Sequence, residues 1–305
     1  MRDWVRRRFR AAYERLLKRE ISGAPTHVAV IQDGNRRYAA ERGGDAHDGH
    51  RAGAETTERM LEWCADVGVQ ELTLYTFSTE NFNRPAAERE RLFDLLEEKL
   101  YEFADADRVH DDGVRIRAIG EVDELPDRVR DAIDYAHRRT RDHDEFVLNI
   151  AVAYGGRSEL LGATRDVASA VDAGDLDPAD IDVAAIESRL HDDPVRDVDL
   201  IIRTGGDERT SNFLPWHANG NEAAVFFCTP YWPEFSKIDF LRGIRTYESR
   251  EESWRQARVQ RALALLRAVG GVELDDARAV VRRFRDYVPD GAEGDVDATD
   301  PDLAD

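Results

Sequence analysis

The sequence predicts an α/β fold: a single domain with a mostly parallel, six-stranded sheet flanked by helices. Two observations lead to this prediction. Short apolar runs rich in β-branched residues alternate along the chain with longer stretches whose apolar residues recur at helical spacing. Strands that are separated by helices form largely parallel sheets with both faces covered. The 305 residues are enough for one large domain, an ample core and appendages.

The strands are predicted where apolar residues form short runs. Residues 27–32 read His-Val-Ala-Val-Ile-Gln, and residues 71–77 read Glu-Leu-Thr-Leu-Tyr-Thr-Phe, which is typical of buried strands. Four further runs have the same character. In chain order, the predicted strands are 27–32, 71–77, 114–119, 146–152, 198–202 and 223–228.

The helices are predicted from apolar stripes and start signals. An arginine-rich helix over residues 1–20 places Trp4, Phe9 and Leu16 on one face, and Pro126 opens a later helix. An Asp-rich loop, 172–182, precedes a further short helix. The other helices are predicted at 35–42, 51–67, 86–108, 126–142, 158–171, 237–246, 250–268 and 274–287.

These elements group into four segments. The amphipathic N-terminal helix belongs to residues 1–24, and the main α/β domain spans residues 25–255. Residues 256–288 form a C-terminal helical extension. Residues 289–305 are acidic and contain Gly and Pro, so we expect a disordered tail there.

The charge of the chain limits its partners. It has 63 acidic and 43 basic residues, with a net charge of -20, and its only lysines are Lys18, Lys99 and Lys237. This charge disfavours nucleic acid and repels anionic substrates at long range. It suits concentrated salt, where the Debye length falls to about 3 Å at 1 M. We infer a salt-loving source, and an acidic enzyme of a GC-rich mesophile is the alternative.

No segment of the sequence indicates export or membrane insertion. No apolar run approaches the roughly 20 residues needed to span a bilayer, and no signal peptide is visible. The expected location is therefore the cytoplasm. Cys64 and Cys228 are far apart in apolar surroundings, which favours buried reduced thiols over a disulfide or a metal site.

The first predicted strand runs directly into Asp33-Gly34-Asn35-Arg36-Arg37-Tyr38. Asp33 would lie at the C-terminal end of a buried strand, and a helix start with two arginines would follow. Such a junction suits a phosphate group, and the carboxylate could hold a divalent cation that bridges phosphate oxygens. The alternative is that Asp33 is simply the N-cap of the helix.

Two other predicted strands also end in polar, arginine-bearing loops. One loop is Ser78 to Pro85, and the other is Arg203 to Phe213, which contains two arginines, Gly205-Gly206 and several hydroxyl groups. In open α/β sheets, ligands bind outside the carboxyl ends of the strands, so we expect the three loops to converge there.

Five motifs in these regions resemble the motif series of the cis-prenyltransferases, the relatives of undecaprenyl diphosphate synthase. Their order and spacing match from about residue 26 to residue 254. The motifs are Asp33-Gly34-Asn35-x-Arg37; Gly49-His50-x-Ala52-Gly53; Phe77-Ser78-x-Glu80-Asn81-x-x-Arg84-Pro85; Asn149-Ile150-Ala151-x-x-Tyr154-Gly155-Gly156-Arg157; and Arg203-Thr204-Gly205-Gly206-x-x-Arg209-x-Ser211-Asn212-Phe213-x-x-Trp216.

The resemblance implies that residues 25–255 are a catalytic domain. Its activity would be the repeated condensation of isopentenyl diphosphate onto an allylic prenyl diphosphate (farnesyl or geranylgeranyl diphosphate), forming cis double bonds. The expected product is a polyprenyl diphosphate of about C50–C60 for a glycosyl carrier lipid, with Mg²⁺ as cofactor. A homodimer is implied, and contact with the membrane surface is possible through the product and the N-terminal helix. The alternative is a catalytically silent family member that serves as a binding subunit.

The resemblance also assigns roles to residues. Gly34, Asn35 and Arg37, with His50 and Arg84 nearby, would hold the allylic diphosphate. Arg203, Arg209 and Ser211 would hold isopentenyl diphosphate. Asp33 and Glu222 would bind Mg²⁺, and Asp33 and Asn81 are the candidate catalytic residues. The other expected substrate contacts are Arg36, Tyr38, Ser78, Thr79, Glu80 and Phe82.

Several of these residues have a simpler interpretation. His50 could cap the helix expected at 51–67, and Ser78 and Asn81 could be ordinary turn residues. Glu80 could be a surface acid. The role of Glu222 depends on an alignment in which two extra residues separate it from Trp232.

The family also implies a hydrophobic tunnel between the sheet and the helices at 51–67 and 86–108. Phe93, Leu96, Leu100 and Phe103 would supply its wall or floor, unless this stripe is plain core. Two departures from the family pattern stand out. Ala46 occupies a place where many members have an arginine, and residues 253–255 read Ser-Trp-Arg where the family often has Arg-x-Gly.

Overall fold

A computed structural model describes residues 2–268, except 192, 194 and 219–221. The predicted helix at 274–287 and the predicted tail at 289–305 lie outside the described residues. The chain divides into two compact units, Met1–Tyr247 and Glu248–Asp305. The sheet and the candidate site belong to the first unit, and helix α9 (Lys237–Ala268) continues from the first unit into the second.

The centre of this unit is a six-stranded sheet in which every strand pair is parallel. The strand order is β3-β4-β2-β1-β5-β6, so β1 is central and β2 and β5 are its neighbours. This confirms the predicted fold class. The strands are β1 (His27–Ile31), β2 (Glu71–Tyr75), β3 (Val114–Ile119), β4 (Phe146–Ala151), β5 (Leu200–Arg203) and β6 (Ala224–Phe227).

The described helices include most of those predicted, some with different ends. They are α1 (Arg2–Glu20), α2 (Asn35–Glu41), α3 (Ala46–Val67), α4 (Ala86–Asp105), α5 (Asp107–Asp111), α6 (Asp127–Thr140), α7 (Gly156–Ala173), α8 (Val183–Glu187) and α9 (Lys237–Ala268). Short 3₁₀ turns include η1 (Thr79–Asn83) and η4 (Trp232–Glu234). Among the described helices, none combines the length and apolar character that crossing a membrane requires.

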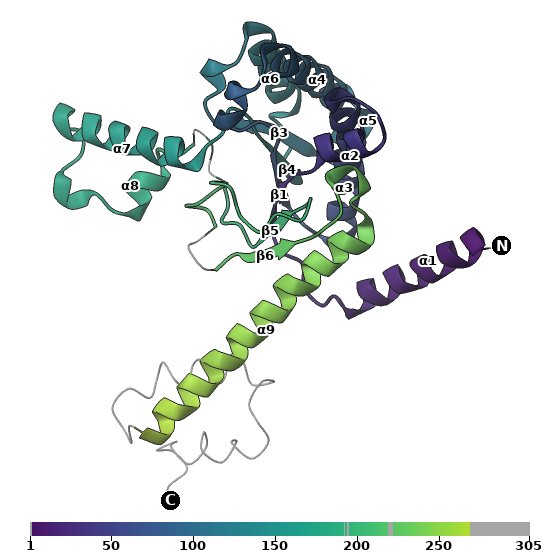
Figure 1. Cartoon of the computed structure of the whole chain (residues 1–305). Coiled ribbons are helices and arrows are strands. Elements are labelled where there is room, and N and C mark those ends of the chain that lie inside the picture. The colour runs from purple at the N-terminus through teal and green to yellow at the C-terminus, as the bar shows by residue number, and fades with distance from the viewer. Residues whose placement is uncertain (1, 192, 194, 219–221, 269–305) are drawn as a thin grey trace, which may run out of the picture. The chain divides into compact units, whose positions relative to one another are not determined.

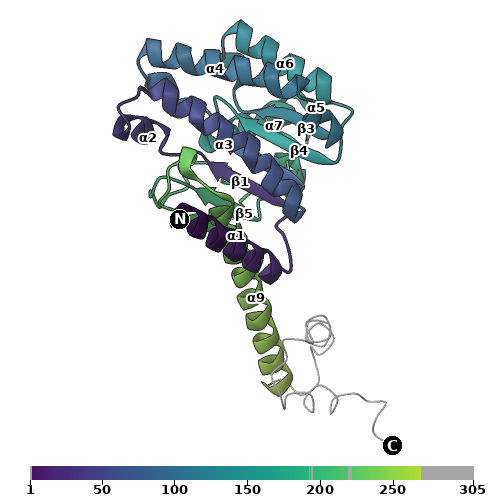
Figure 2. The same ribbon diagram turned by 90° about the vertical axis from the view of Figure 1, so that its right-hand side faces the viewer.

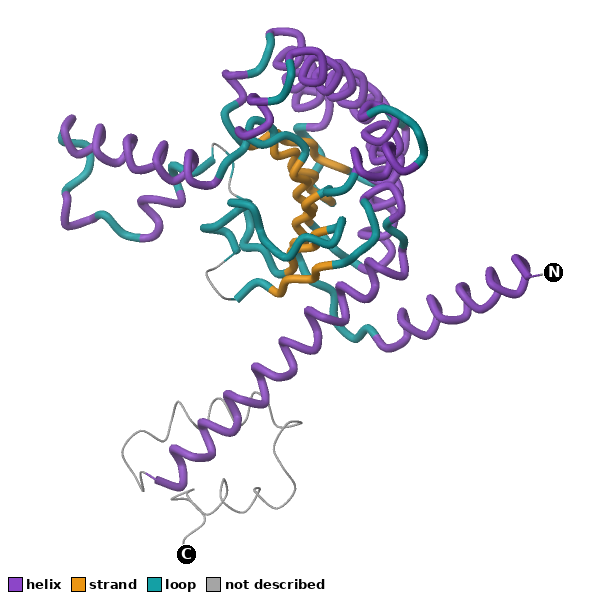
Figure 3. Tube along the Cα trace, in the orientation of Figure 1, coloured by secondary structure: helices purple, strands orange, loops and turns teal. Residues whose placement is uncertain are grey.

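One face of the sheet is covered by helices. Figures 1 and 2 show α3 and α4 side by side, and in the tube view of Figure 3 these helices flank the strands. Met60 and Trp63 of α3 and Phe93 and Leu100 of α4 are buried in a core that includes Val30 of β1. Side chains along a strand alternate between its two faces, so the neighbours of Val30 in β1 point to the opposite face of the sheet.

The opposite face of the sheet is covered differently from the prediction. Here Ile31 and Ile201 pack with Phe213 and Leu214 of the loop that follows β5, and the ring of Phe213 stacks on Tyr75 at 4.5 Å. This loop occupies the place that the prediction gave to helices. In Figure 1, α7 and α8 extend away from the sheet.

Three predicted helix boundaries were wrong. Helix α3 begins at Ala46 because Asp45 caps it, accepting hydrogen bonds from the amides of His47 and Asp48. His50 therefore lies within the helix and does not cap it. The predicted helix 86–108 is divided at Ala106, whose backbone is extended, into α4 and α5. The predicted helices 237–246 and 250–268 form one continuous helix, α9.

Two glycines of α3 permit a close approach of α2. A Cβ atom added at Gly49 would lie 2.0 Å from the backbone oxygen of Asn35, and one added at Gly53 would lie 2.4 Å from Oδ1 of the same residue. The Gly49-His50-x-Ala52-Gly53 motif thus brings the start of α2 against α3. This packing fixes Asn35 and His50 on adjacent helices.

We expect Gly49→Ala to destabilise the fold by about 1–3 kcal/mol, because the methyl group cannot be accommodated without separating α2 from α3. Gly162→Ala in α7 is the matched control, since nothing lies within 4 Å of its added Cβ. The control should be neutral or stabilising by up to about 1 kcal/mol, because alanine favours helix. Denaturant unfolding of both variants measures the difference, and equal stabilities would contradict the packing described here.

Candidate functional site

Asp33 lies just beyond the end of β1, at the point where β1 and β5 separate. Ile31 of β1 is in register with Arg203 of β5 and with Tyr75 of β2. The hydroxyl of Thr204 donates to the backbone oxygen of Asp33 at 2.7 Å and accepts from its amide at 3.0 Å. Because Thr204 is fully buried, this pair of bonds fixes the backbone of Asp33 against β5.

The carboxylate of Asp33 is held by positive groups. Arg203 Nη2 donates to Oδ2 at 2.7 Å, while the Gly34 amide and Arg37 Nη2 donate to Oδ1 at 2.6 and 3.3 Å. Burial alone would raise the pKa of Asp33, but the hydrogen bond and charge of Arg203, the Gly34 amide and the charge of Arg37 together lower it below its ordinary value. Asp33 is therefore ionised at neutral pH.

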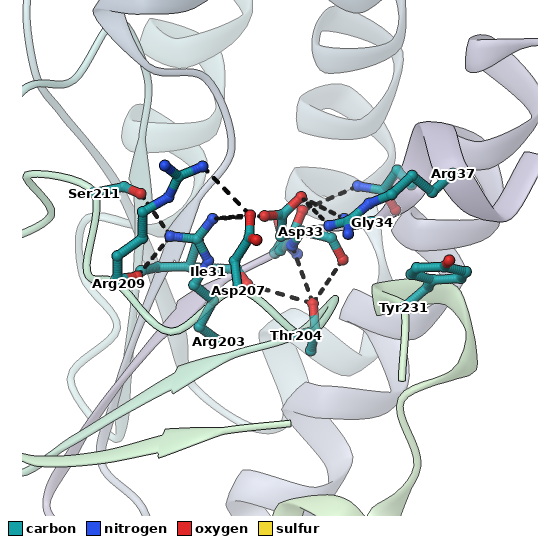
Figure 4. A network of polar contacts seen from close by, with 12 residues as sticks. Ile31, Asp33, Gly34, Arg37, Arg203, Thr204, Asp207, Arg209, Ser211 and Tyr231 are labelled. Atoms are coloured by element: carbon teal, nitrogen blue, oxygen red, sulfur yellow. Dashed lines mark hydrogen bonds and ion pairs between the residues drawn. The ribbon is translucent and has the colours of Figure 1, made fainter. Parts of the chain in front are cut away.

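Arg203 is the centre of this network (Figure 4). Its side chain is 4% exposed. Besides Asp33, Nη2 donates to Asp207 at 3.0 Å, and Nη1 donates to the Arg209 backbone oxygen at 2.5 Å and to Ser211 Oγ at 2.6 Å. The Nε atom is buried without a hydrogen-bond partner among the described residues. A single guanidinium thus connects the end of β1 with the whole loop after β5.

The same loop also presents cationic and hydroxyl groups to solvent. The Arg209 side chain is 72% exposed, and its ion pair with Asp207 is long, at 3.4 Å. Ser211 has a positive φ of 50°, and so does the following Asn212, at 59°. Asn212 accepts from the amides of Gly156 and Arg157, which attaches the loop to the start of α7. The loop is therefore anchored at both ends and leaves the Arg209 guanidinium available for an anion.

Gly34 occupies a position that only glycine suits. Its φ is 97°, and an added Cβ would lie 2.5 Å from the ring of Tyr231. The segment after β6 closes over this turn, because the amide of Trp232 donates to the Asp33 backbone oxygen at 3.0 Å and the Arg37 guanidinium lies 5.4 Å from the Tyr231 ring centroid. The backbone of residues 33 and 34 is thereby enclosed on both sides.

A second group of polar residues faces the same region from α2, α3 and η1. His50 Nε2 and Asn35 Oδ1 are buried without hydrogen-bond partners among the described residues. Burial, followed by the nearby charges of Arg84 and Arg36, lowers the pKa of His50 to about 4. His50 is therefore neutral at pH 7. Arg84 and Arg36 form ion pairs with Glu88, at 2.9 and 3.7 Å. Arg84 and Arg36 offer positive charge to an anion, and His50 Nε2 can donate to it when it carries the ring proton, whereas Asn35 Oδ1 is an acceptor.

Both groups open onto one cavity of about 330 Å³, which lies between the sheet and helices α3 and α4. Its polar end includes Asp33, His50 and Arg209, and its other end is apolar. Such a combination of a few polar groups with an apolar lining is typical of a small-molecule site. The remaining lining includes Asn35, Ser78, Glu80, Asn81, Arg84, Arg203, Ser211, Leu92, Leu95, Leu96, Lys99, Leu100, Phe103, Leu148 and Ile150. A shallower adjoining hollow adds Gly34, Arg36, Arg37 and Asp207.

The structure does not bring every predicted residue to this cavity. The ring of Tyr38 packs under the Arg42 guanidinium, at 3.8 Å from its centroid, and Phe82 packs edge-on against Phe77 at 5.0 Å. The hydroxyl of Thr79 lies beside Gly155. Tyr38, Thr79 and Phe82 are absent from the described lining of the cavity. Phe93, expected in a tunnel wall, is likewise buried in the core.

The predicted metal pair of Asp33 and Glu222 is not formed within this chain. Glu222 lies in the turn before β6, two residues before Ala224, which is in register with Leu200 and through it with Val28. That is the N-terminal edge of the sheet, whereas Asp33 lies at the C-terminal edge. Parallel strands place these two positions at opposite ends.

Other residues of the site were not predicted as site residues. Asp207, Tyr231 and Trp232 all lie around Asp33, and Lys99 lines the apolar part of the cavity. For Asp207, the signal was its place between two arginines of the Gly-Gly loop. No sequence pattern indicated that residues 231 and 232 return to the end of β1.

Comparison with known proteins identifies the family. Residues 31–255 match the family model described as "Putative undecaprenyl diphosphate synthase". The chain belongs to the undecaprenyl diphosphate synthase family, the cis-prenyltransferases. It is therefore an enzyme of prenyl transfer.

Curated relatives extend over nearly the whole chain. A protein from Halobacterium salinarum, named tritrans,polycis-undecaprenyl-diphosphate synthase (geranylgeranyl-diphosphate specific), is 72% identical over 288 residues, 94% of this chain and 95% of the relative. A protein of the same name from Haloarcula marismortui is 63% identical over 97% of each chain. These salt-loving sources agree with the prediction from the acidic composition.

Solved cis-prenyltransferases share the fold. Lavandulyl diphosphate synthase from Lavandula x intermedia, solved in complex with dimethylallyl diphosphate, has a TM-score of 0.70 and 32% identity, over 73% of this chain and 95% of that chain. A probable undecaprenyl diphosphate synthase from Campylobacter jejuni has a TM-score of 0.59 and 30% identity, with the same coverage.

We expect Asp33→Asn to lower kcat at least about 100-fold at saturating Mg²⁺. Removing a group that helps to stabilise the charge of the transition state typically costs that much in rate. The fold should persist, because Arg203 keeps Asp207 as a partner. Asp175→Asn, at an exposed carboxylate in the turn after α7, is the control and should match the wild type. Steady-state rates, with circular dichroism to check folding, test this; more than half of normal turnover in Asp33→Asn would remove Asp33 from the mechanism.

Proposed function

We propose that this enzyme condenses isopentenyl diphosphate repeatedly onto geranylgeranyl diphosphate with cis double bonds, and releases a polyprenyl diphosphate of about C50–C60 for a glycosyl carrier lipid. The observation that carries the proposal is the single cavity that joins two cationic groups of residues to an apolar interior. The names of the curated relatives support the primer and the undecaprenyl product. Its place of action would be the cytoplasm, at the membrane surface that takes up the lipid product.

Two diphosphates need two anion sites, and the cavity offers them. Arg209, Ser211 and the loop organised by Arg203 form one, which we assign to isopentenyl diphosphate. Gly34, Asn35, Arg37 and His50 form the other, which we assign to the allylic primer. Asp33 lies between the two, in contact with both Arg203 and Arg37.

The residues at Asp33 fit Mg²⁺. This ion prefers oxygen ligands, and it binds through one or two carboxylates together with substrate phosphates and water. Asp33 supplies an ionised carboxylate that is 31% exposed, and Oδ2, which accepts from Arg203, keeps a second lone pair for a cation. Bound Mg²⁺ would neutralise diphosphate charge. Asp33 is the protein ligand that this chain offers at the site.

The remaining residues would position the reacting groups. In the proposed reaction the primer loses diphosphate, the C3–C4 double bond of isopentenyl diphosphate attacks its C1, and a proton leaves. Arg37 and neutral His50 would bind the departing diphosphate. Asn81 lines the cavity, and because its Oδ1 accepts from the Ser78 amide at 3.0 Å, its NH₂ group is the side-chain donor that could serve a substrate. The apolar lining would exclude water from the allylic cation.

The growing chain would extend into the apolar end of the cavity, as a tunnel between the sheet, α3 and α4. Leu96, Leu100 and Phe103 of α4 line it together with Leu148 and Ile150 of β4. Each CH₂ buried there contributes about 0.8 kcal/mol. Growth would end when the hydrocarbon fills this space, and long products would leave slowly.

The product assay tests the whole proposal. We expect labelled isopentenyl diphosphate and Mg²⁺ to give polyprenyl products most rapidly with the twenty-carbon allylic primer, and more slowly with primers of fifteen and ten carbons. Chromatography of dephosphorylated products against standards measures both primer preference and length. No elongation from any primer would contradict the function, and fastest growth from the fifteen-carbon primer would contradict the primer assignment alone.

Arginine substitutions should separate the two diphosphate sites. Arg209→Ala should raise the KM for isopentenyl diphosphate about 10- to 100-fold, because that is the loss in affinity expected when one charge-assisted hydrogen bond is removed. The KM for the primer should change little. Arg37→Ala should show the opposite bias. Arg203→Ala is less selective, because Arg203 contacts both Asp33 and the Ser211 loop, although we still expect the larger effect on isopentenyl diphosphate. Arg138→Ala, on the exposed face of α6, is the control. Equal effects of Arg209→Ala and Arg37→Ala on both substrates would show that the two sites are assigned wrongly.

We propose that the enzyme is a homodimer, as its family resemblance implies. The α7–α8 segment supports this, because it extends from the sheet (Figure 1) and exposes large apolar side chains: Leu161 is 55% exposed and Val183 is 61% exposed. We expect sedimentation equilibrium to give the mass of two chains, and Leu161→Asp with Val183→Asp to shift it toward one. A wild-type mass near 34.6 kDa across concentrations and salt would contradict the dimer.

A further inference from the structure

A cluster of two histidines and one glutamate lies outside the prenyl site. Glu159 is in the first turn of α7, His191 precedes Asp193 in the segment before β5, and His217 follows Trp216. One ligand atom of each lies within 4.8 Å of the others. Three segments that are distant in sequence therefore direct a nitrogen or oxygen toward one point.

The distances within the cluster suit a tetrahedral metal ion. Nε2 of His191 lies 3.1 Å from Nε2 of His217 and 3.1 Å from Oε1 of Glu159. Ligands at about 2.0–2.1 Å from a tetrahedral Zn²⁺ are themselves about 3.3 Å apart. The side chains are also well buried, since Glu159 is 6% exposed, His191 is 7% and His217 is 4%.

Without a cation, the hydrogen bonding of this cluster is incomplete. Oε1 of Glu159 is buried and has no hydrogen-bond partner among the described residues, although His191 is near. A neutral His191 has a single N–H, so Nε2 cannot donate to both His217 and Glu159. An ion between the three atoms would accept all three lone pairs. Leaving a buried carboxylate oxygen unpaired is costly, which points to a ligand here.

A neighbouring tyrosine orients the carboxylate. The Tyr154 hydroxyl donates to Oε2 of Glu159 at 2.8 Å, which leaves Oε1 directed at the histidines. Tyr154 is fully buried, so its ring is held in place beside Glu159. Hydrogen bonds of this kind, from an outer residue to a ligating carboxylate, are typical of metal sites.

An entry path exists from solvent. Glu159 and His191 line a surface hollow whose other lining residues include Glu121, Asp123, Asp166 and Asp193. Glu121, Asp123 and Asp166 favour cations, whereas Asp193 is paired with Arg115, and Arg117 and Arg189 also line the hollow. Mg²⁺, which prefers oxygen ligands, does not suit a site with two imidazoles, whereas Zn²⁺ and its transition-metal neighbours do.

We propose that Glu159, His191 and His217 form a binding site for a divalent transition metal of the Zn²⁺ class, separate from the Mg²⁺ position at Asp33. The three side chains supply three ligands, and the hollow leaves a fourth position to water. The metal holds α7 to the loops around residues 191 and 217. Through Asn212, which contacts the first residues of α7, it also steadies the loop that carries Ser211.

The test is zinc binding by the full-length chain. We expect metal-free protein, incubated with ZnSO₄ in excess Mg²⁺ and desalted, to retain about one Zn²⁺ per chain by elemental analysis. Cobalt should give the visible absorption of a tetrahedral site. Saturating Zn²⁺ should raise the Tm by roughly 5 °C, since a ligand at 100 times its Kd stabilises to that extent.

Substitutions locate the site. Glu159→Gln and His191→Ala should each weaken zinc binding at least about 100-fold, and Tyr154→Phe should weaken it about 10-fold, as loss of an outer partner does. His137→Ala is the matched control, because this exposed histidine of α6 lines the same hollow outside the cluster. Circular dichroism without metal checks folding, and His191→Ala serves if Glu159→Gln fails to fold. No retained zinc in the wild type would overturn the proposal. Unchanged binding in both ligand variants, or an equal loss in His137→Ala, would also overturn it.

Discussion

The candidate site depends on one buried guanidinium, that of Arg203. It lies at the end of β5 between the carboxylates of Asp33 and Asp207, and it also contacts Ser211 and the backbone of Arg209. A buried charge left without a partner costs about 3–5 kcal/mol, so these contacts are needed for the loop to keep its shape. The same contacts keep Asp33 ionised. A single ion-pair network therefore sets both the geometry of the loop and the charge of the proposed metal ligand.

The positive charges near the site oppose the overall negative charge of the chain. The chain carries a net charge of -20, which opposes the binding of any diphosphate at long range. Anion binding must instead come from arginines within a few ångströms, where salt screens them less than it screens the distant field. Arg209 and Arg37 meet this requirement on the two sides of Asp33. The adjoining apolar cavity adds a hydrocarbon environment that is insensitive to charge.

The parts of the structure that were predicted from sequence are those set by local patterns. The six parallel strands follow from apolar runs, and the convergence of Asp33 with the Arg203 loop follows from the rule that parallel strands end at one edge. Tertiary contacts decided the rest. The direction of the Tyr38 ring depends on Arg42, and the covering of Gly34 depends on Tyr231, almost 200 positions away. Glu222 lies at the far edge of the sheet because it comes before the N-terminal end of β6. The cap at Asp45 was a local signal that the prediction missed.

The central claim is that two diphosphates bind side by side around Asp33 and the Arg203 loop. The most direct measurement is equilibrium binding of isopentenyl diphosphate together with an unreactive thiodiphosphate analogue of geranylgeranyl diphosphate, in Mg²⁺ and high salt. Two adjacent sites predict one of each ligand per chain, bound at the same time, with the isopentenyl diphosphate site selectively weakened by Arg209→Ala. Mutual exclusion of the two ligands, with a combined stoichiometry of one, would contradict it.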